Sequence, residues 1–270
     1  MKKSILIFLL ILINSICAHD QHVHQYLTKE GYYLLRNYLG VDISQMLAHL
    51  ENSPVNSPWE NGTLTAGAWR EDEEDIVYGR YQIVPGDPVG ALISISHFWD
   101  ADQGDLSENE FDVAWWFFTG RIGPYTNAYD KIKKMANGGY ILFFSTNPYI
   151  RVQKVNGQWL RLIPGTPNNI ALSYNSLVDL YNNKRLITQL VGSYRMYNES
   201  TSSYEAYSGD VYISDDFRDK LFWEILGRMC HLVQDMSVPA HTRSDEHGIT
   251  TDDYEDWISE NEHWTFWSAN

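Results

Sequence analysis

The sequence predicts a mainly α fold, a multi-helix bundle into which one small β-hairpin is inserted. Apolar and aromatic residues recur at helical spacing in four segments, residues 24–39, 109–135, 176–196 and 216–236. Residues 140–163 instead alternate around Asn156-Gly157, a strong signal for a hairpin turn. No segment repeats with a period of about 20 to 50 residues, so a solenoid or propeller is not expected.

The remaining elements follow from local composition. A second short helix is expected over residues 41–50, directly after the first. Residues 51–66 are rich in Asn, Ser, Pro, Gly and Thr, which predicts an exposed loop. Residues 76–110 look irregular, and a Ser-, Tyr- and Gly-rich loop over residues 198–209 separates the last two helices.

The composition is that of a globular protein with a sizeable core. The chain has 270 residues, of which 44% are hydrophobic and 14% aromatic, which argues against disorder. Its formal charge of −15 repels phosphate polymers and anionic membranes unless metal ions intervene. A groove that binds nucleic acid through lysines alone is therefore not expected.

The first 18 residues read as a secretory signal peptide. Two lysines precede a nine-residue apolar run, residues 5–13, which is too short to span a bilayer of about 30 Å. Cleavage near Ala18 would leave a secreted or periplasmic domain, residues 19–270, that has no transmembrane anchor and that we expect to be a monomer. Only Cys230 would remain, so no internal disulfide can form and stability must come from packing or bound metal.

The sharpest chemical signal is the segment from His231 to His241. His231 and Asp235 are four residues apart and project from one face of a helix, and Pro239 bends the chain so that His241 can approach the same point. Imidazole and carboxylate at that spacing are a natural zinc pair. The alternative is a simple hydrogen-bonded helix pair, but the apolar neighbours place this face inside a bundle, where an unpaired carboxylate is costly.

Two motifs together resemble the bacterial zinc-dependent phospholipase C family, whose superfamily includes the fungal single-strand-specific nucleases. Residues 231–241 match HxxxDxxxPxH, and residues 97–102 match HF(W/Y)DPD except that Ala101 replaces the proline. The resemblance implies a helical bundle around a trinuclear zinc site. It does not cover the predicted hairpin or the loop at 198–209.

The resemblance assigns ligands to three zinc ions. Gly67 is followed five residues later by Asp72, as in the family, and Asp75 is the fallback for this position. The first zinc would be bound by Asp72, His97, His231 and Asp235. The second would be bound by His24, by the bridging Asp235 and by the amino group and carbonyl of the mature N-terminal residue, here His19.

The third zinc is expected at His241 together with a further histidine and an acid. Glu255 fits the acid, and His247, eight residues before it, takes the histidine role across an insertion. Asp253 and His263 are rival ligands. Family members carry further helices after the last ligand, whereas 15 residues follow Glu255 here, which leaves open that the chain is C-terminally truncated.

These assignments predict a secreted phosphodiesterase of the phospholipase C type, which hydrolyses phospholipid headgroup esters at a membrane surface with a zinc-activated water. Asp72 could double as the proton acceptor. Aromatic residues that the choline-selective members use are replaced by Glu73 and Ser94, so Glu73 is a candidate countercharge for a cationic headgroup. The alternatives are an exported single-strand nuclease or nucleotidase, with nucleic acid as substrate, and a non-catalytic zinc-binding protein.

Overall fold

The computed structural model describes much of the chain. The described residues are 21–47, 63–77, 80–81, 95–104, 108–115, 118–143, 150–153, 159–164, 170–182, 187–188, 190–191, 194–198, 201–206, 211–213, 215–238 and 257. The predicted signal peptide lies outside them, as do His19, His241, His247 and Glu255 and the rivals Asp253 and His263.

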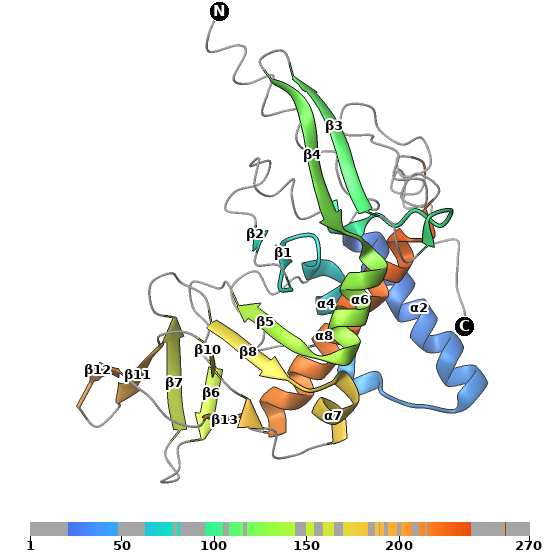
Figure 1. Cartoon of the computed structure of the whole chain (residues 1–270). Helices are drawn as coiled ribbons and strands as arrows, with labels where there is room; N and C mark the ends of the chain where they lie inside the picture. Colours follow the sequence, from blue (N-terminus) through green and yellow to red (C-terminus); the bar gives the residue numbers. More distant parts are fainter. Residues whose placement is uncertain are drawn as a thin grey trace, which may run out of the picture.

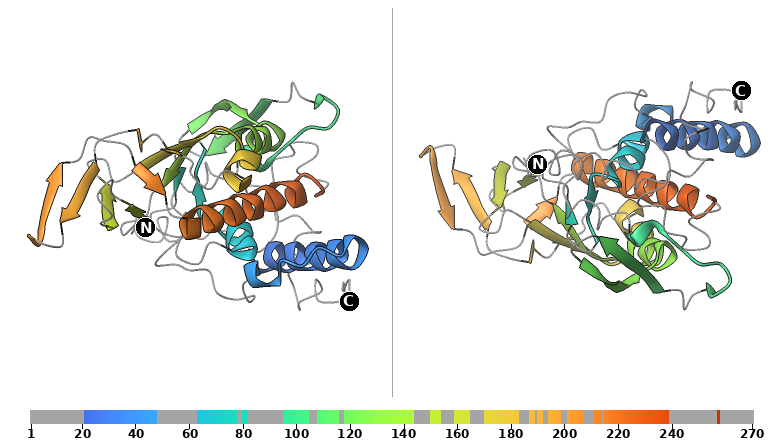
Figure 2. Two further views of the ribbon diagram at one scale, coloured as in Figure 1. Left: turned by 90° about the horizontal axis from the view of Figure 1, so that it is seen from below. Right: turned by 90° about the horizontal axis from the view of Figure 1, so that it is seen from above.

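A helical body surrounds the long helix α8, Asp215–Asp235. Helices α2, Gln21–Leu39, and α4, Leu64–Arg70, lie on one side of it. Helices α6, Ala128–Asn137, and α7, Leu177–Asn182, lie on the other (Figure 2). This helical body agrees with the predicted mainly α class, and the helices predicted at 24–39 and 216–236 correspond to α2 and α8. No helix among the described residues is long and apolar enough to cross a membrane.

Two helices of the body begin at capping residues, and two short 3-10 turns accompany the helices. The Thr63 hydroxyl accepts a hydrogen bond from Ala66 N at 3.2 Å, and the Asn127 side chain accepts one from Asp130 N at 2.8 Å, so both α4 and α6 begin at a polar cap. The 3-10 turns are η1, Ser44–Met46, within the predicted second helix, and η2, Ile95–His97, which packs on α6.

Helices α4 and α8 cross at two glycines with their backbones in contact. A Cβ atom at Gly227 would lie 2.0 Å from Leu64 O, and one at Gly67 would lie 2.0 Å from Glu224 O. No side chain fits at either position without moving a backbone carbonyl. The two glycines therefore set the distance between α4 and α8, and with it the distance between the residues that follow them.

The structure also describes strands, which follow α4 in the sequence and precede α8. They are β1 Glu74–Asp75, β2 Arg80–Tyr81, β3 Glu108–Trp115, β4 Phe118–Thr126, β5 Gly139–Phe143, β6 Ile150–Gln153, β7 Trp159–Pro164, β8 Ile170–Tyr174, β9 Ile187–Thr188, β10 Leu190–Val191, β11 Tyr194–Asn198, β12 Ser203–Ala206 and β13 Val211–Ile213. They form the antiparallel pairs β1-β2 and β3-β4, a three-stranded sheet β10-β8-β5 and a six-stranded sheet β12-β11-β7-β6-β13-β9. The six-stranded sheet lies beyond the N-terminal end of α8 (Figure 1).

Two segments predicted to be helical contain strands instead. Helix α6 occupies only the end of residues 109–135, because β3 and β4 precede it as a paired ribbon. Gly120, Gly123 and Pro124 weaken a helix there, and the aromatic and β-branched residues between them favour a strand. Residues 176–196 begin with α7 but continue as β9, β10 and β11, where β-branched residues such as Ile187, Thr188 and Val191 favour strands.

The predicted hairpin region also belongs to larger sheets. Strands β6 and β7 pair with Gln153 opposite Trp159, on either side of Asn156-Gly157, which lies outside the described residues. Strand β5, however, pairs with β8, and β12 lies within the predicted loop at 198–209. Local alternation indicated the strands but carried no information on their distant partners.

Candidate metal centre

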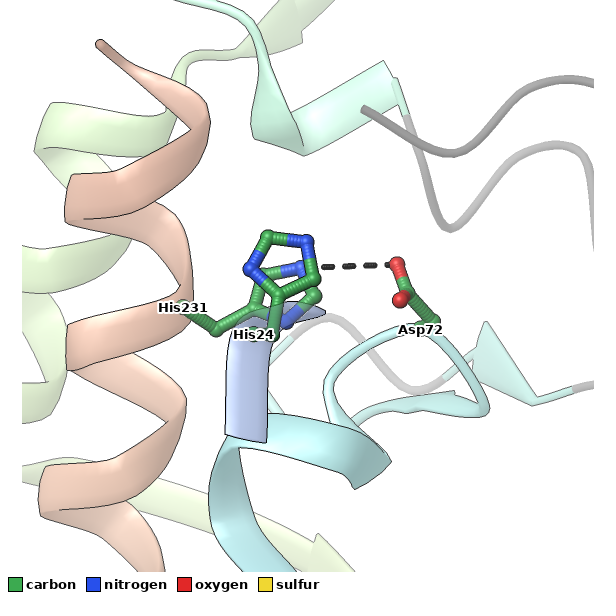
Figure 3. A group of neighbouring side chains, drawn as sticks. All are labelled: His24, Asp72 and His231. Atoms are coloured by element: carbon green, nitrogen blue, oxygen red, sulfur yellow. Dashed lines mark ion pairs between the residues drawn. The ribbon is translucent and has the colours of Figure 1, made fainter. Parts of the chain in front are cut away.

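Five of the predicted ligands come together at the C-terminal half of α8. We call His24, Asp72, His97, His231 and Asp235 the metal centre. Helix α8 supplies His231 and Asp235, α2 supplies His24, η2 supplies His97, and Asp72 follows the end of α4. Figure 3 shows that His24 and Asp72 both lie beside His231, although they come from different elements. All five side chains are buried, with exposed fractions between 0% and 4%.

Asp235 is the residue that touches all three histidines. Its Oδ2 lies 2.8 Å from His97 Nδ1 and 3.1 Å from His231 Nε2, and its Oδ1 lies 3.4 Å from His24 Nε2. Asp72 Oδ1 lies 3.4 Å from His231 Nε2 and 3.8 Å from His97 Nδ1. The nitrogens of three rings therefore point at two carboxylates from different parts of the chain.

Two of the histidines are oriented by hydrogen bonds on their far sides. His231 Nδ1 lies 2.6 Å from the backbone carbonyl of Ala68, and His24 Nδ1 lies 2.8 Å from Gln234 Oε1. The Gln234 amide is itself fixed, because its Nε2 donates to Thr28 Oγ1 at 2.9 Å. A carbonyl oxygen can only accept, so both rings carry a proton on Nδ1 and have Nε2 facing the carboxylates.

Among the described residues, no lysine or arginine pairs with the carboxylates of the metal centre. The ion pairs of Asp72 and Asp235 in the described chain are all with histidines, and their carboxylate oxygens have no hydrogen-bond partner there. With neutral histidines the centre carries two buried negative charges, which is costly without a positive partner. A divalent cation balances that charge and accepts the histidine lone pairs.

The donor set therefore fits a metal ion. Two groups each bring their ligand atoms within 4.8 Å of one another, His24 with Asp72 and His231, and His97 with His231 and Asp235. Imidazole nitrogen with carboxylate oxygen is a set that suits zinc and other divalent transition metals. These buried residues could hold a metal ion.

The pKa values of the centre reflect this uncompensated charge. Burial lowers the pKa of His231, but Asp72 and Asp235 oppose it and hold that pKa well above 6.5. Burial raises the pKa of Asp235 from 3.8 to about 6, against the attraction of His231. Both shifts favour a protonated centre when no metal is bound, which is the state that metal binding must displace.

A pH dependence of stability follows. Asp235 binds its proton more tightly in the folded chain, so its contribution to stability is lost as the pH rises from about 4 through about 6. The contribution of His231 is complete below pH 6.5 and is lost as the pH rises through its higher folded pKa. We expect the melting temperature of the metal-free protein to fall between pH 5 and pH 8, and the stabilisation by added zinc to grow over that range.

Thermal melts with and without zinc check this, and Asp235→Asn is the matched control. The variant cannot titrate at residue 235 and lacks one of the two carboxylates beside His231. Without metal, the melting temperature of the variant should fall less steeply with pH than that of the wild type. Equal slopes in the two proteins would show that the centre does not couple protonation to folding.

The structure distinguishes Asp72 from its fallback Asp75. Asp75 Oδ2 lies 3.2 Å from Lys131 Nζ and accepts a hydrogen bond from Ser96 Oγ at 3.0 Å, so this carboxylate is already paired. Asp72 instead faces the histidines. The carboxylate available to a metal ion is therefore that of Asp72.

Beside the metal centre lies a buried network of paired charges, which we call the ion network. Lys131 contacts Glu71 and Asp75, Arg228 Nη1 lies 3.1 Å from Glu71 Oε2, and Arg228 Nη2 lies 3.3 Å from Glu224 Oε1. Arg70 Nε lies 3.3 Å from the same Glu224 oxygen. Three cations thus meet three carboxylates, Glu71, Asp75 and Glu224. In contrast to the metal centre, the ion network is balanced without a metal.

Sequence reasoning missed Gln234, Ala68 and the ion network. Gln234 precedes a predicted ligand, but nothing in the spacing showed that its amide would meet His24 from another helix. Glu73, a predicted countercharge, accepts a hydrogen bond from Trp69 Nε1 at 2.9 Å and pairs with Arg70 at 3.7 Å. Cys230 is a half-buried free thiol on α8, and burial raises its pKa to about 11, so it stays protonated at neutral pH.

Comparisons with protein-family models, with curated proteins and with solved structures find no match for this chain. Its function is therefore inferred from the geometry of the metal centre and from the sequence motifs.

Proposed function

We propose that this chain is an exported zinc-dependent phosphoric diester hydrolase of the phospholipase C type. The observation that carries the proposal is the metal centre itself, where two unbalanced buried carboxylates face three histidine rings. Balanced buried charges, as in the ion network, are common in structural cores. Two buried carboxylates that face histidine nitrogens rather than lysines or arginines are typical of a metal site.

In this proposal the metal centre holds zinc through His24, Asp72, His97, His231 and Asp235. The predicted ligands outside the described residues, His19, His241, His247 and Glu255, would complete a set of three ions. Bound zinc supplies Lewis acidity toward phosphoryl oxygens and lowers the pKa of a bound water. Asp72 then has a second role as proton acceptor. The two oxygens of its carboxylate have no hydrogen-bond partner among the described residues, which supports this role.

Two sequence features support a lipid rather than a nucleic acid substrate. The segment HFWDAD at residues 97–102 lies closer to the phospholipase form of the motif than to the nuclease form. The net charge of −15 also disfavours a long polyanion, whose binding normally uses several lysines and arginines. Export is supported by the composition of residues 1–18.

The test is hydrolysis by the zinc-loaded protein of zwitterionic phospholipid vesicles and, in parallel, of single-stranded DNA. We expect release of phosphorylated headgroup from the lipid, with Asp72→Asn reducing kcat by at least about 100-fold, a loss typical of a general base. Asp75→Asn is the control, because Asp75 is a buried carboxylate three residues away that pairs with Lys131. Cleavage of DNA but not of lipid would show that the protein is a nuclease. A zinc-loaded protein inactive on both substrates would contradict an enzymatic role.

A further inference from the structure

The third histidine of the metal centre, His97, lies between carboxylates on both sides of its ring. Its Nδ1 lies 2.8 Å from Asp235 Oδ2 and 3.8 Å from Asp72 Oδ1. Its Nε2 lies 3.8 Å from Glu71 Oε1. The ring is 1% exposed, and Glu71 is fully buried. One nitrogen of His97 therefore faces the metal centre while the other faces the ion network.

Glu71 is held in place more firmly than an ordinary glutamate. Arg228 Nη1 lies 3.1 Å from its Oε2, and Lys131 Nζ contacts its Oε1. Both cations are fully buried, so a rotation of Glu71 away from them would remove one carboxylate partner from each of two buried charges. Its Oε1 is thus fixed on the side of the His97 ring opposite the metal centre.

The chemistry of imidazole determines which nitrogen of His97 can bind a metal and which carries the proton. A neutral ring has one protonated nitrogen, and a metal can use only the other. Because His97 Nδ1 is the atom beside Asp235, a metal ligand at Nδ1 requires the proton on Nε2, where Glu71 is the facing acceptor. The present separation of 3.8 Å is longer than a hydrogen bond of about 2.9 Å, so the two atoms would have to move closer together when the metal binds.

We propose that Glu71 is a positioning residue for the metal centre, which accepts a hydrogen bond from His97 Nε2 and so directs Nδ1 at the metal. This inference rests on the proposed zinc function. It sets His97 apart from the other two histidines, whose far nitrogens face neutral acceptors, the Ala68 carbonyl and the Gln234 amide. A carboxylate acceptor raises the basicity of the imidazole more than a neutral acceptor does. Among the three histidines, His97 would therefore gain most as a metal ligand from its outer partner.

The competing explanation is that Glu71 only balances Lys131 and Arg228. Two other carboxylates separate these explanations, because Asp75 shares Lys131 with Glu71, and Glu224 shares Arg228 with it. Asp75 contacts Lys131 and Ser96, and Glu224 contacts Arg70 and Arg228. Asp75→Asn and Glu224→Gln therefore disturb the same ion network, while Glu71→Gln also changes the acceptor opposite His97.

The experiment measures zinc affinity of the full chain by competition with a chromophoric chelator, for wild type and the three variants. We expect Glu71→Gln to bind zinc about 10- to 100-fold more weakly than wild type, the range found when a ligand's outer partner is removed. Asp75→Asn and Glu224→Gln should lower the melting temperature but keep zinc affinity within about threefold of wild type.

A second measurement on the zinc-loaded wild type does not depend on any variant folding. Histidine tautomers read by long-range proton–nitrogen NMR should show His97 protonated on Nε2, and His24 and His231 on Nδ1. Equal zinc affinities in the three variants, or His97 protonated on Nδ1, would overturn the role of Glu71 while leaving the zinc function standing. A folded wild type that binds no zinc would overturn the proposed function instead.

Discussion

Asp235→Asn should abolish the zinc response of this protein and, without metal, make it more stable. Asp235 contacts His24, His97 and His231, so the change reaches all three histidines of the metal centre at once. The amide keeps the size of the side chain but is a poor metal ligand. We expect zinc affinity to fall by more than about 100-fold, beyond the loss caused by removing an outer partner.

The gain in stability has a separate cause. Burial raises the pKa of Asp235 to about 6, so at pH 8 the folded chain carries an ionised carboxylate in an unfavourable place beside Asp72. The neutral asparagine removes that charge. Melting curves at pH 8 should therefore rank the variant above wild type without zinc and below it with zinc, and a variant that keeps the zinc-induced shift would contradict the role of Asp235.

Gly227→Ala should strongly destabilise the fold. The new Cβ would lie 2.0 Å from Leu64 O, so α4 and α8 must move apart. Alanine gains about 1 kcal/mol of helix propensity over glycine, whereas overpacking costs about 1 to 3 kcal/mol, and more when the obstructing atom is a backbone carbonyl. We expect a net loss of at least about 2 kcal/mol.

The same change should weaken zinc binding, because the orientation of His231 depends on Ala68 O, which lies on the helix being displaced. Gly31→Ala is the matched control. Gly31 also lies inside a helix, α2, but a Cβ there would meet nothing within 4 Å. Denaturant unfolding should show Gly31→Ala at or above wild-type stability. If Gly227→Ala unfolds at the same denaturant concentration as Gly31→Ala, the close crossing of α4 and α8 is wrong.

The parts of the structure that sequence could predict are those set by short spacing. The helical period identified α2 and α8, and the four-residue interval placed His231 and Asp235 on one face, where they lie 3.1 Å apart. His24, Asp72 and His97 were brought to the same point only through motif resemblance, since no local pattern links residues so far apart in the chain.

The features that the sequence did not predict depend on contacts between segments that are distant in the chain. The ribbon of β3 and β4 was taken for helix because its aromatic residues also fit a helical period. Nothing in the sequence marks Glu71 and Lys131 as partners, yet both are fully buried in one network. The reciprocal role of Gly67 and Gly227 could be recognised only after α4 and α8 were placed against each other.

The most direct test of the central claim is the metal content of the folded protein. The chain is dialysed against metal-free buffer after loading with zinc, and bound metal is measured by mass spectrometry alongside a circular dichroism spectrum. The metal centre predicts at least one tightly held zinc per chain, and three would agree with the full ligand set that includes His19, His241, His247 and Glu255. A helical, cooperatively folding sample that retains no zinc would contradict the metal centre.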